Sequence, residues 1–144
     1  MIAVDTNLLV HAHRRDAELH FRAKKVLSEL AEGVIPWGIC LHSLVEFYGV
    51  VTTLRLWRVP STPEEAFNQI SAWRESPSLR LLCDDGTMLP LLGDLARAGS
   101  IRGAKIHDAR IASCCLIHGV DELLTIDRDF SRFPRLKTSN PLIE

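Results

Sequence analysis

The 144-residue sequence has no apolar run that approaches the roughly 20 residues needed for a membrane-spanning helix. It also has no excess of one charge, because 17 Lys and Arg oppose 18 Asp and Glu for a formal net charge of −1. Such a balance gives no overall attraction to nucleic acid or to a membrane surface. The N-terminus shows no basic region followed by an apolar core and a small-residue cleavage site. We therefore expect neither a transmembrane helix nor a secretory signal.

Cysteine is also scarce, and its positions lack the C-x-x-C spacing of zinc and redox sites. The four cysteines are Cys40, Cys83, Cys114 and Cys115. The adjacent Cys114 and Cys115 cannot easily bond to each other. We expect all four to be reduced core residues of a cytoplasmic protein rather than a disulfide framework.

Short apolar runs alternate along the chain with longer segments of helical periodicity. The apolar runs predict strands at residues 1–4, 34–36, 79–83 and 122–126, and a last short strand between 136 and 143. Apolar residues spaced by three and four predict helices at 16–32, 41–56, 63–75, 87–98 and 105–118, besides a short helix after Asp5. This order indicates an α/β domain whose mainly parallel sheet is covered on both faces. The length fits a single domain, residues 1–144.

An aspartate follows the first predicted strand directly, in MIAVDTNLLV. Taken alone, Asp5 has two equally good interpretations, as the N-cap of the next helix or as a functional acid. Asp127 follows the strand predicted at 122–126 in the same way, within TIDRDF. Ligand sites in open parallel sheets gather at the carboxyl ends of the strands. Two carboxylates at that edge are harder to explain as helix caps than one.

Two further acids stand among apolar neighbours. Glu46 lies inside the predicted helix segment HSLVEFYGVV, and Asp108 lies near the start of the helix KIHDARIASCCLI. A buried carboxylate without a partner is costly, and capping cannot supply a partner to Glu46 in mid-helix. Asp108 has a structural alternative, a favourable interaction with the N-terminal end of its helix dipole. For each residue alone, the structural and the functional interpretation are equally good.

The four acids together favour a metal site. Carboxylates gathered at one sheet edge repel each other and raise their own pKa values. A hard divalent cation relieves this repulsion, and Mg²⁺ or Mn²⁺ prefers carboxylate oxygens and water as ligands. Such an ion lowers the pKa of water and stabilises charge on a phosphate, which suits hydrolysis of a phosphodiester.

The segments VDTN, VEF, HDARIA and TIDRDF, in this order, resemble the motifs of PIN-domain ribonucleases. More narrowly, the chain resembles the toxin component of bacterial VapBC toxin–antitoxin pairs, and FSRFPRLKTSNP resembles the ending of one branch of these toxins. The resemblance covers nearly the whole chain. It implies a three-layer α/β/α PIN-like domain with a mainly parallel central sheet of four to five strands.

The family's site residues fall on eight positions of this sequence. As catalytic and metal-binding acids, the resemblance implies Asp5, Glu46, Asp108 and Asp127. As supporting groups it implies Thr6, Asn7 and Thr125, while Asp129 is an alternative to Asp127 as the fourth acid. We prefer Asp127 because it is nearer the end of the predicted strand.

The resemblance also implies a function and partners. These are an Mg²⁺- or Mn²⁺-dependent endoribonuclease that cleaves RNA with one or two ions, and a homodimer held inactive by a cognate VapB-type antitoxin. The helical region from Glu46 to Trp57 is either a docking surface or ordinary core. The alternative from another class is a PIN-like binding module that has lost catalysis. Divalent-ion binding, and its dependence on one of the acids, distinguishes the two.

One rival enzyme class has a matching fragment. Asp127-Arg128-Asp129 has the D-x-D shape of haloacid-dehalogenase-type phosphatases, but those enzymes carry it near the start of their core domain, whereas here it lies close to the end of the chain.

Several cations and histidines have structural interpretations that we prefer. A basic cluster can hold phosphates of RNA, but solvated surface is the expectation for Arg102, Lys105 and Arg110. Surface positions are likewise expected for His11, His13 and His20, which no cysteine or second histidine group joins.

Overall fold

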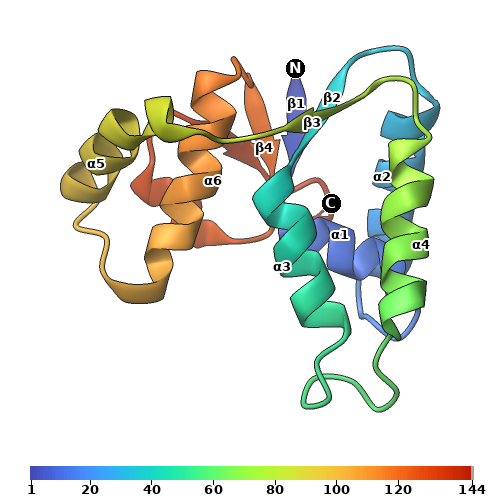
Figure 1. Ribbon diagram of the computed structural model, residues 1–144. Helices are drawn as coiled ribbons and strands as arrows, with labels where there is room; N and C mark the ends of the chain where they lie inside the picture. Colours follow the sequence, from blue (N-terminus) through green and yellow to red (C-terminus); the bar gives the residue numbers. More distant parts are fainter. Residues whose placement is uncertain (144) are drawn as a thin grey trace.

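The computed structural model describes residues 1–143 and contains a central sheet of five strands (Figure 1). The strands are β1 (Ile2–Val4), β2 (Trp37–Cys40), β3 (Leu79–Leu82), β4 (Glu122–Leu124) and β5 (Lys137–Ser139). Their order in the sheet is β3-β2-β1-β4-β5, and every neighbouring pair is parallel. The expected PIN-like α/β/α fold with a mainly parallel sheet is confirmed.

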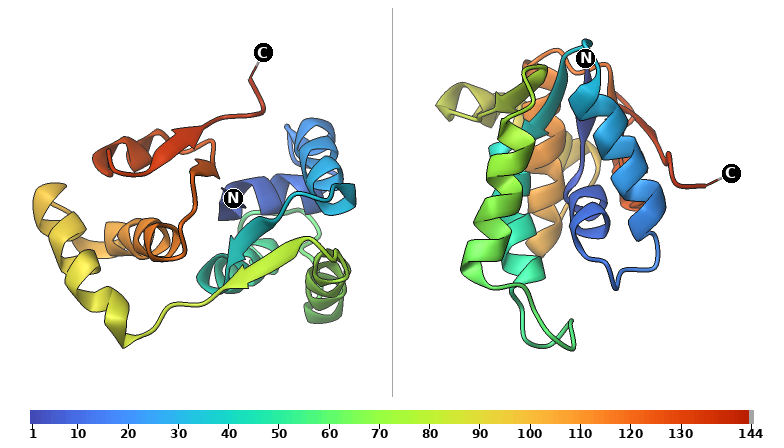
Figure 2. Two further views of the ribbon diagram at one scale, coloured as in Figure 1. Left: turned by 90° about the horizontal axis from the view of Figure 1, so that it is seen from above. Right: turned by 90° about the vertical axis from the view of Figure 1, so that its right-hand side faces the viewer.

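Helices connect these strands and cover the sheet. Within residues 1–143 the α-helices are α1 (Thr6–His13), α2 (His20–Glu32), α3 (Leu41–Val51), α4 (Pro63–Arg74), α5 (Leu89–Ala98) and α6 (Ile106–Ile117). Short 3₁₀ turns are η1 (Gly86–Met88) and η2 (Gly103–Lys105), which precede α5 and α6, and η3 (Arg128–Arg132), which follows β4. Figure 2 shows α1 and α2 on one side of the sheet and α5 and α6 on the other.

Each face of the sheet carries its own apolar core. Successive strand side chains point to opposite faces, so Val4 joins the core formed with α1 to α4, while Ala3 joins the core formed with α5 and α6. The first core is filled by large side chains such as Trp37 and Phe47, which are fully buried. Burial of these apolar groups holds the helices against the strands and fixes the strand ends relative to one another.

The centre of the sheet contains the point at which the strand order reverses. The chain passes from β1 through β2 to β3, and then returns to the other side of β1 to form β4. In open parallel sheets such a reversal leaves a crevice at the carboxyl ends of the strands. The backbone N–H of Asp5 donates to the carbonyl of Leu124 at 2.9 Å. The residues that follow β1 and β4 therefore lie side by side in that crevice.

The strand predicted at residues 34–36 is wrong, because β2 begins at Trp37. Val34 and Ile35 are 93% and 74% exposed. Gly38 hides the true strand in the sequence, since glycine is unfavourable inside a strand. A Cβ atom at Gly38 would lie 2.8 Å from Cδ1 of Leu82, so a larger residue there would displace the side chain of that leucine.

Several predicted boundaries also extend too far. α2 begins at His20 rather than near residue 16, because residues 14–20 form two tight turns. α3 ends at Val51 rather than near residue 56, and β4 ends at Leu124 rather than at residue 126. Asp127 therefore lies three residues beyond the end of its strand.

The cysteines are all free. Cys40, Cys114 and Cys115 are buried as expected, but Cys83 is exposed, which corrects its assignment to the core. The sulfur atoms of Cys40 and Cys115 lie 3.9 Å apart. Within the described residues, no helix combines the length and the apolar character needed to cross a membrane.

Candidate functional site

Asp5 lies directly after β1 and is held by hydrogen bonds on both carboxylate oxygens. Oδ1 accepts from the backbone N–H of Thr6 at 2.8 Å, which makes Asp5 the N-cap of α1. Oδ2 accepts from Oγ1 of Thr125 at 2.7 Å and from Nδ2 of Asn7 at 3.2 Å. The side chain is thus both a helix cap and part of a polar network that joins the ends of β1 and β4.

The surroundings of Asp5 oppose its negative charge. The residue is only 4% exposed, and this burial raises the pKa of its carboxyl group to about 7. Hydrogen bonds from Thr125 and Thr6 lower this pKa, whereas the charges of Glu46 and Asp108 raise it further. Among residues 1–143, the hydrogen bonds to this carboxylate therefore come from neutral donors alone.

Glu46 reaches the same crevice from α3. Its Oε1 accepts a hydrogen bond from Oγ1 of Thr6 at 3.0 Å, and Nε2 of His42 lies 3.7 Å away. The apolar neighbours in the sequence do not bury Glu46, whose side chain is 34% exposed, because the helix turns Phe47 into the core instead. Its partner is therefore a threonine hydroxyl rather than an arginine.

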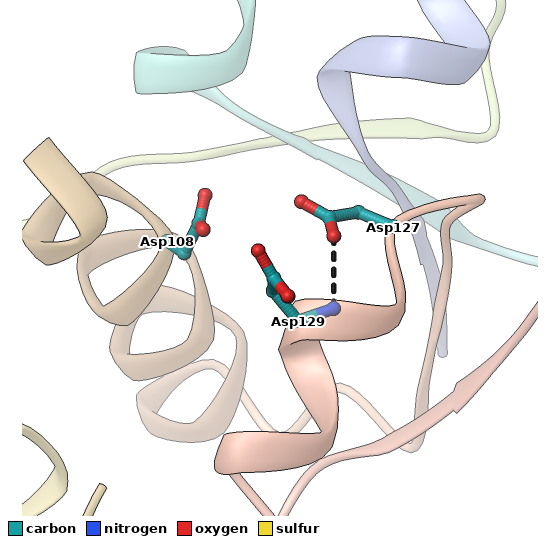
Figure 3. Close-up of side chains that lie close together, drawn as sticks. All are labelled: Asp108, Asp127 and Asp129. Carbon is teal, nitrogen blue, oxygen red and sulfur yellow. Dashed lines mark hydrogen bonds between the residues drawn. The ribbon is translucent and has the colours of Figure 1, made fainter. Parts of the chain in front are cut away.

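Three further aspartates lie close together at this crevice (Figure 3). One carboxylate oxygen from each of Asp108, Asp127 and Asp129 lies within 4.8 Å of the other two. Asp127 is the N-cap of η3, and its Oδ1 accepts from the backbone N–H of Asp129 at 2.8 Å. The backbone N–H of Asp127 in turn donates to Oγ1 of Thr125 at 3.0 Å, which connects this group to Asp5.

The surroundings of these aspartates shift the pKa values of Asp108 and Asp129 in opposite directions. Burial and the nearby charge of Asp127 raise the pKa of Asp108. The ammonium group of Lys105 forms an ion pair with Asp129 and lowers the pKa of that carboxyl group. The same ammonium lies 3.8 Å from Asp108. Lys105 is exposed, as expected, and forms a surface ion pair as well.

The two groups of acids meet in one cavity of about 260 Å³. Its lining residues are Asp5, Thr6, Asn7, Val10, His11, Glu46, Val50, Asp108 and Asp127. All four expected acids are thus brought together. Asp129 is outside this lining but close to Asp108 and Asp127, while Thr125 supports the cavity through Asp5.

His11 is a cavity residue that we expected at the surface. Its Nδ1 accepts from the backbone N–H of Leu19 at 3.3 Å. The signal in the sequence is its spacing of four from Asn7, which places both side chains on one face of α1. His20 is buried and His13 bonds Gln69 and Ser61 through its two ring nitrogens, so the surface assignment is wrong for them as well.

Arg110 is likewise engaged rather than free at the surface. Its Nε donates to Oδ2 of Asp84 at 2.5 Å, and its Nη2 donates to Oδ1 of the same residue at 3.2 Å. This bidentate pair lowers the pKa of Asp84 and fixes the guanidinium group beside the start of α6.

Comparison with known proteins identifies the family. The family model of the PIN domain matches residues 2–136. The chain is 32% identical over 142 residues to ribonuclease VapC43 of Mycobacterium tuberculosis, an alignment that covers 99% of this chain and 96% of that protein.

Solved structures with lower identity share the fold. The VapC20 toxin of Mycobacterium tuberculosis, described as cleaving the sarcin–ricin loop, superposes with a TM-score of 0.69 at 20% identity over 91% of this chain and 93% of that chain. The VapBC2 complex of Rickettsia felis, bound to a DNA fragment from its promoter, gives a TM-score of 0.68 at 21% identity over 97% and 98%. The match over residues 2–136, together with 32% identity along almost the full length, shows that this chain belongs to the PIN domain family, among the VapC ribonucleases.

Proposed function

We propose that this chain is a VapC-type toxin endoribonuclease that hydrolyses RNA phosphodiester bonds with Mg²⁺ or Mn²⁺ held in the acidic cavity. One observation carries the proposal: four carboxylates from distant parts of the chain line a single cavity of about 260 Å³. The ribonuclease relatives, which align over almost the whole chain, support the same reaction.

The chemistry of the cavity fits a hard divalent cation. The charged ligands it offers are carboxylates, which Mg²⁺ and Mn²⁺ prefer. Burial, together with the charges of neighbouring carboxylates, raises the pKa values of Asp5 and Asp108, and a bound cation would offset both effects. We assign Asp5, Glu46, Asp108 and Asp127 to the ion, and Asp127 rather than Asp129 as the fourth acid, because Lys105 already neutralises Asp129.

The chain's own residues would position these ligands before RNA arrives. Thr125 and Asn7 hold Asp5, Thr6 holds Glu46, and the backbone N–H of Asp129 holds Asp127. When bound, a divalent ion polarises the phosphate and lowers the pKa of water. The reaction then needs no covalent intermediate on a side chain. The cavity's role is to place the scissile phosphate and the attacking water in line.

The partners and setting follow from the same family. We infer that a VapB-type antitoxin controls this chain, since the Rickettsia felis neighbour is a VapBC complex, and that the toxin forms a homodimer in the cytoplasm. We also infer that residues 1–144 form one PIN domain. The exposed Leu54 and Leu56, beyond the end of α3, support a docking role for part of the region from Glu46 to Trp57.

The test is cleavage of tRNA and ribosomal RNA by the purified protein with Mg²⁺ or Mn²⁺. We expect cleavage that EDTA abolishes and that Asp5→Asn and Asp108→Asn each abolish while the protein stays folded. Asp94→Asn, which changes an exposed acid on α5, is the matched control and should cleave normally. Mn²⁺ binding without cleavage of any RNA would contradict the nuclease and favour the PIN-like binding module.

A further inference from the structure

Two histidine rings stack beside the acidic cavity. His42 lies in α3, one turn before Glu46, and His107 lies in the first turn of α6, next to Asp108. Their ring centroids are 5.2 Å apart and the ring planes are inclined by 18°. The stack therefore joins two helices, each of which carries one carboxylate of the cavity.

The two rings have different surroundings. The side chain of His42 is only 12% exposed, so this ring forms the inner layer of the stack. His107 is exposed and forms the outer layer. An exposed ring that a neighbour already holds in place loses little conformational freedom when a ligand stacks on it.

Packing alone does not account for the inner ring. Nε2 of His42 is buried and has no hydrogen-bond partner among residues 1–143. Its distance of 3.7 Å from Oε1 of Glu46 is too long for a hydrogen bond. A buried polar atom without a partner costs free energy that an apolar ring of similar size avoids. A polar ring at this position favours a role in the site over a role in the core.

Two cationic residues lie close to His107 in the sequence. Lys105 precedes His107 by two residues and Arg110 follows it by three, and each is held in place by an acid, Asp129 and Asp84 respectively. Proteins bind single-stranded nucleic acid with this combination, in which a base stacks on an aromatic ring while cations attract the backbone. Unpaired bases of RNA are free to stack in this way, whereas bases inside a duplex are not.

We propose that an unpaired base of the RNA substrate, adjacent to the phosphate at the carboxylates, stacks on His107 while His42 supports the ring from behind. The inference rests on the proposed function and adds a positioning residue to it, because it assigns His107 to an unpaired base beside the reacting phosphate. Stacking of this kind tolerates different bases, so His107 selects an unpaired base rather than a particular sequence.

The test measures binding separately from cleavage, with Ca²⁺ present. Fluorescence anisotropy compares a short oligoadenylate with an abasic RNA of the same length, which keeps the phosphates and lacks the bases. We expect His107→Ala to raise the Kd for oligoadenylate about 10-fold and His107→Phe to stay within about threefold of the wild type. On the abasic RNA all three proteins should bind equally. His118→Ala, which removes another exposed histidine of the same region of chain, should bind like the wild type.

The inference is overturned if His107→Ala binds oligoadenylate as tightly as the wild type, or loses affinity equally for the abasic RNA. It is also overturned if His107→Phe weakens binding as much as His107→Ala. Melting curves of each variant establish that it is folded. Cleavage by the wild type with Mn²⁺, measured in parallel, tests the nuclease itself: a base preference without cleavage contradicts the nuclease alone, and cleavage without a base preference contradicts the stack alone.

Discussion

The two halves of the acidic cavity hold their carboxylates by different means. In the inner half, defined as Asp5 with Thr6, Asn7 and Thr125, a buried acid is held by neutral hydrogen-bond donors. The outer half is defined as Asp108 and Asp127 together with Asp129 and Lys105, which lie beside the cavity lining; here partly exposed acids lie close together, and an ammonium group pairs with two of them. The pKa of Asp5 is raised to about 7, whereas that of Asp129 is lowered.

This difference indicates where a bound cation contributes most. A fixed, desolvated carboxylate without a positive partner gains more from a divalent ion than one that is exposed and already paired. Asp5 should therefore dominate ion binding and catalysis, and Asp129 should contribute little. The predictions below test this asymmetry, from the largest expected effect to the smallest.

The largest effect on RNA cleavage is expected when Asp5 loses its charge, and the same change at Asp129 is the comparison. Asp5→Asn should lower kcat/KM for RNA cleavage by about 1,000-fold or more, because it removes a preorganised charge at the reacting phosphate. Asp129→Asn should lower it by less than about 10-fold, since this residue acts only through its neighbours. Equal losses in the two variants, measured at saturating Mn²⁺, would contradict the assignment of Asp127 rather than Asp129.

The second effect concerns stability and pH. The pKa of Asp5 is higher in the folded protein, about 7, than its ordinary value of 3.8, so between these values the folded state binds more protons than the unfolded state. The free energy of unfolding without metal should therefore fall as the pH rises through this range, by up to about 4 kcal/mol from this residue.

Urea unfolding in EDTA at pH 5 and pH 8 measures this dependence. Asp5→Asn should remove most of the decrease, so the variant should be the more stable protein at pH 8. Addition of Mn²⁺ at pH 8 should stabilise the wild type far more than the variant. Burial lowers the pKa of His11, His13 and His42 and acts in the opposite direction, so the difference in stability between the wild type and Asp5→Asn is the quantity that isolates Asp5. A difference that is the same at pH 5 and pH 8 would count against a desolvated Asp5.

The third effect tests the link between the halves. Oγ1 of Thr125 donates to Asp5 and accepts from the backbone N–H of Asp127 and from Nδ2 of Asn7. Thr125→Val keeps the shape of the side chain but removes these bonds, and should cost about 1–3 kcal/mol of stability and about 10-fold to 100-fold in activity. Thr125→Ser keeps the hydroxyl and should retain most of both. If the serine variant fails as badly as the valine variant, the hydroxyl is not the important group.

The smallest effect is expected at Lys105. Its ammonium group competes with a divalent ion for the charge of Asp108 and Asp129. Lys105→Met should therefore tighten Mn²⁺ binding about twofold to fivefold, as measured by calorimetry at low ionic strength. Lys25→Met, which alters an exposed lysine of α2, is the control and should leave the Mn²⁺ affinity unchanged. Weaker Mn²⁺ binding in Lys105→Met would show that the lysine orders the aspartates instead of competing with the ion.

Much of the fold is predictable from local patterns, because apolar runs and helical periodicity follow from which faces are buried. The position of Asp5 at the end of a strand is predictable in this way, because the apolar run before it marks the strand. The strand at Trp37–Cys40 is not, because its glycine makes room for Leu82 of another strand. Local sequence contains no information about such a contact.

The candidate site also combines features that local sequence predicts with features that depend on contacts between distant elements. The convergence of Asp5 and Asp127 can be expected from the parallel sheet alone, while that of Glu46 and Asp108 needed the family resemblance. The stack of His42 on His107 depends on how α3 and α6 lie against each other. The ion pair of Lys105 with Asp129 depends on how η2 lies against η3. Helical periodicity shows which residues share a face of one helix, but it does not show what lies opposite that face.

The most direct test of the central claim is the position of a bound ion. Anomalous diffraction from crystals soaked with Mn²⁺ should show a peak inside the cavity, in contact with Asp5 and with at least one of Asp108 and Asp127. A peak held only by Asp108, Asp127 and Asp129, away from Asp5, would contradict the account and would make the outer half the metal site.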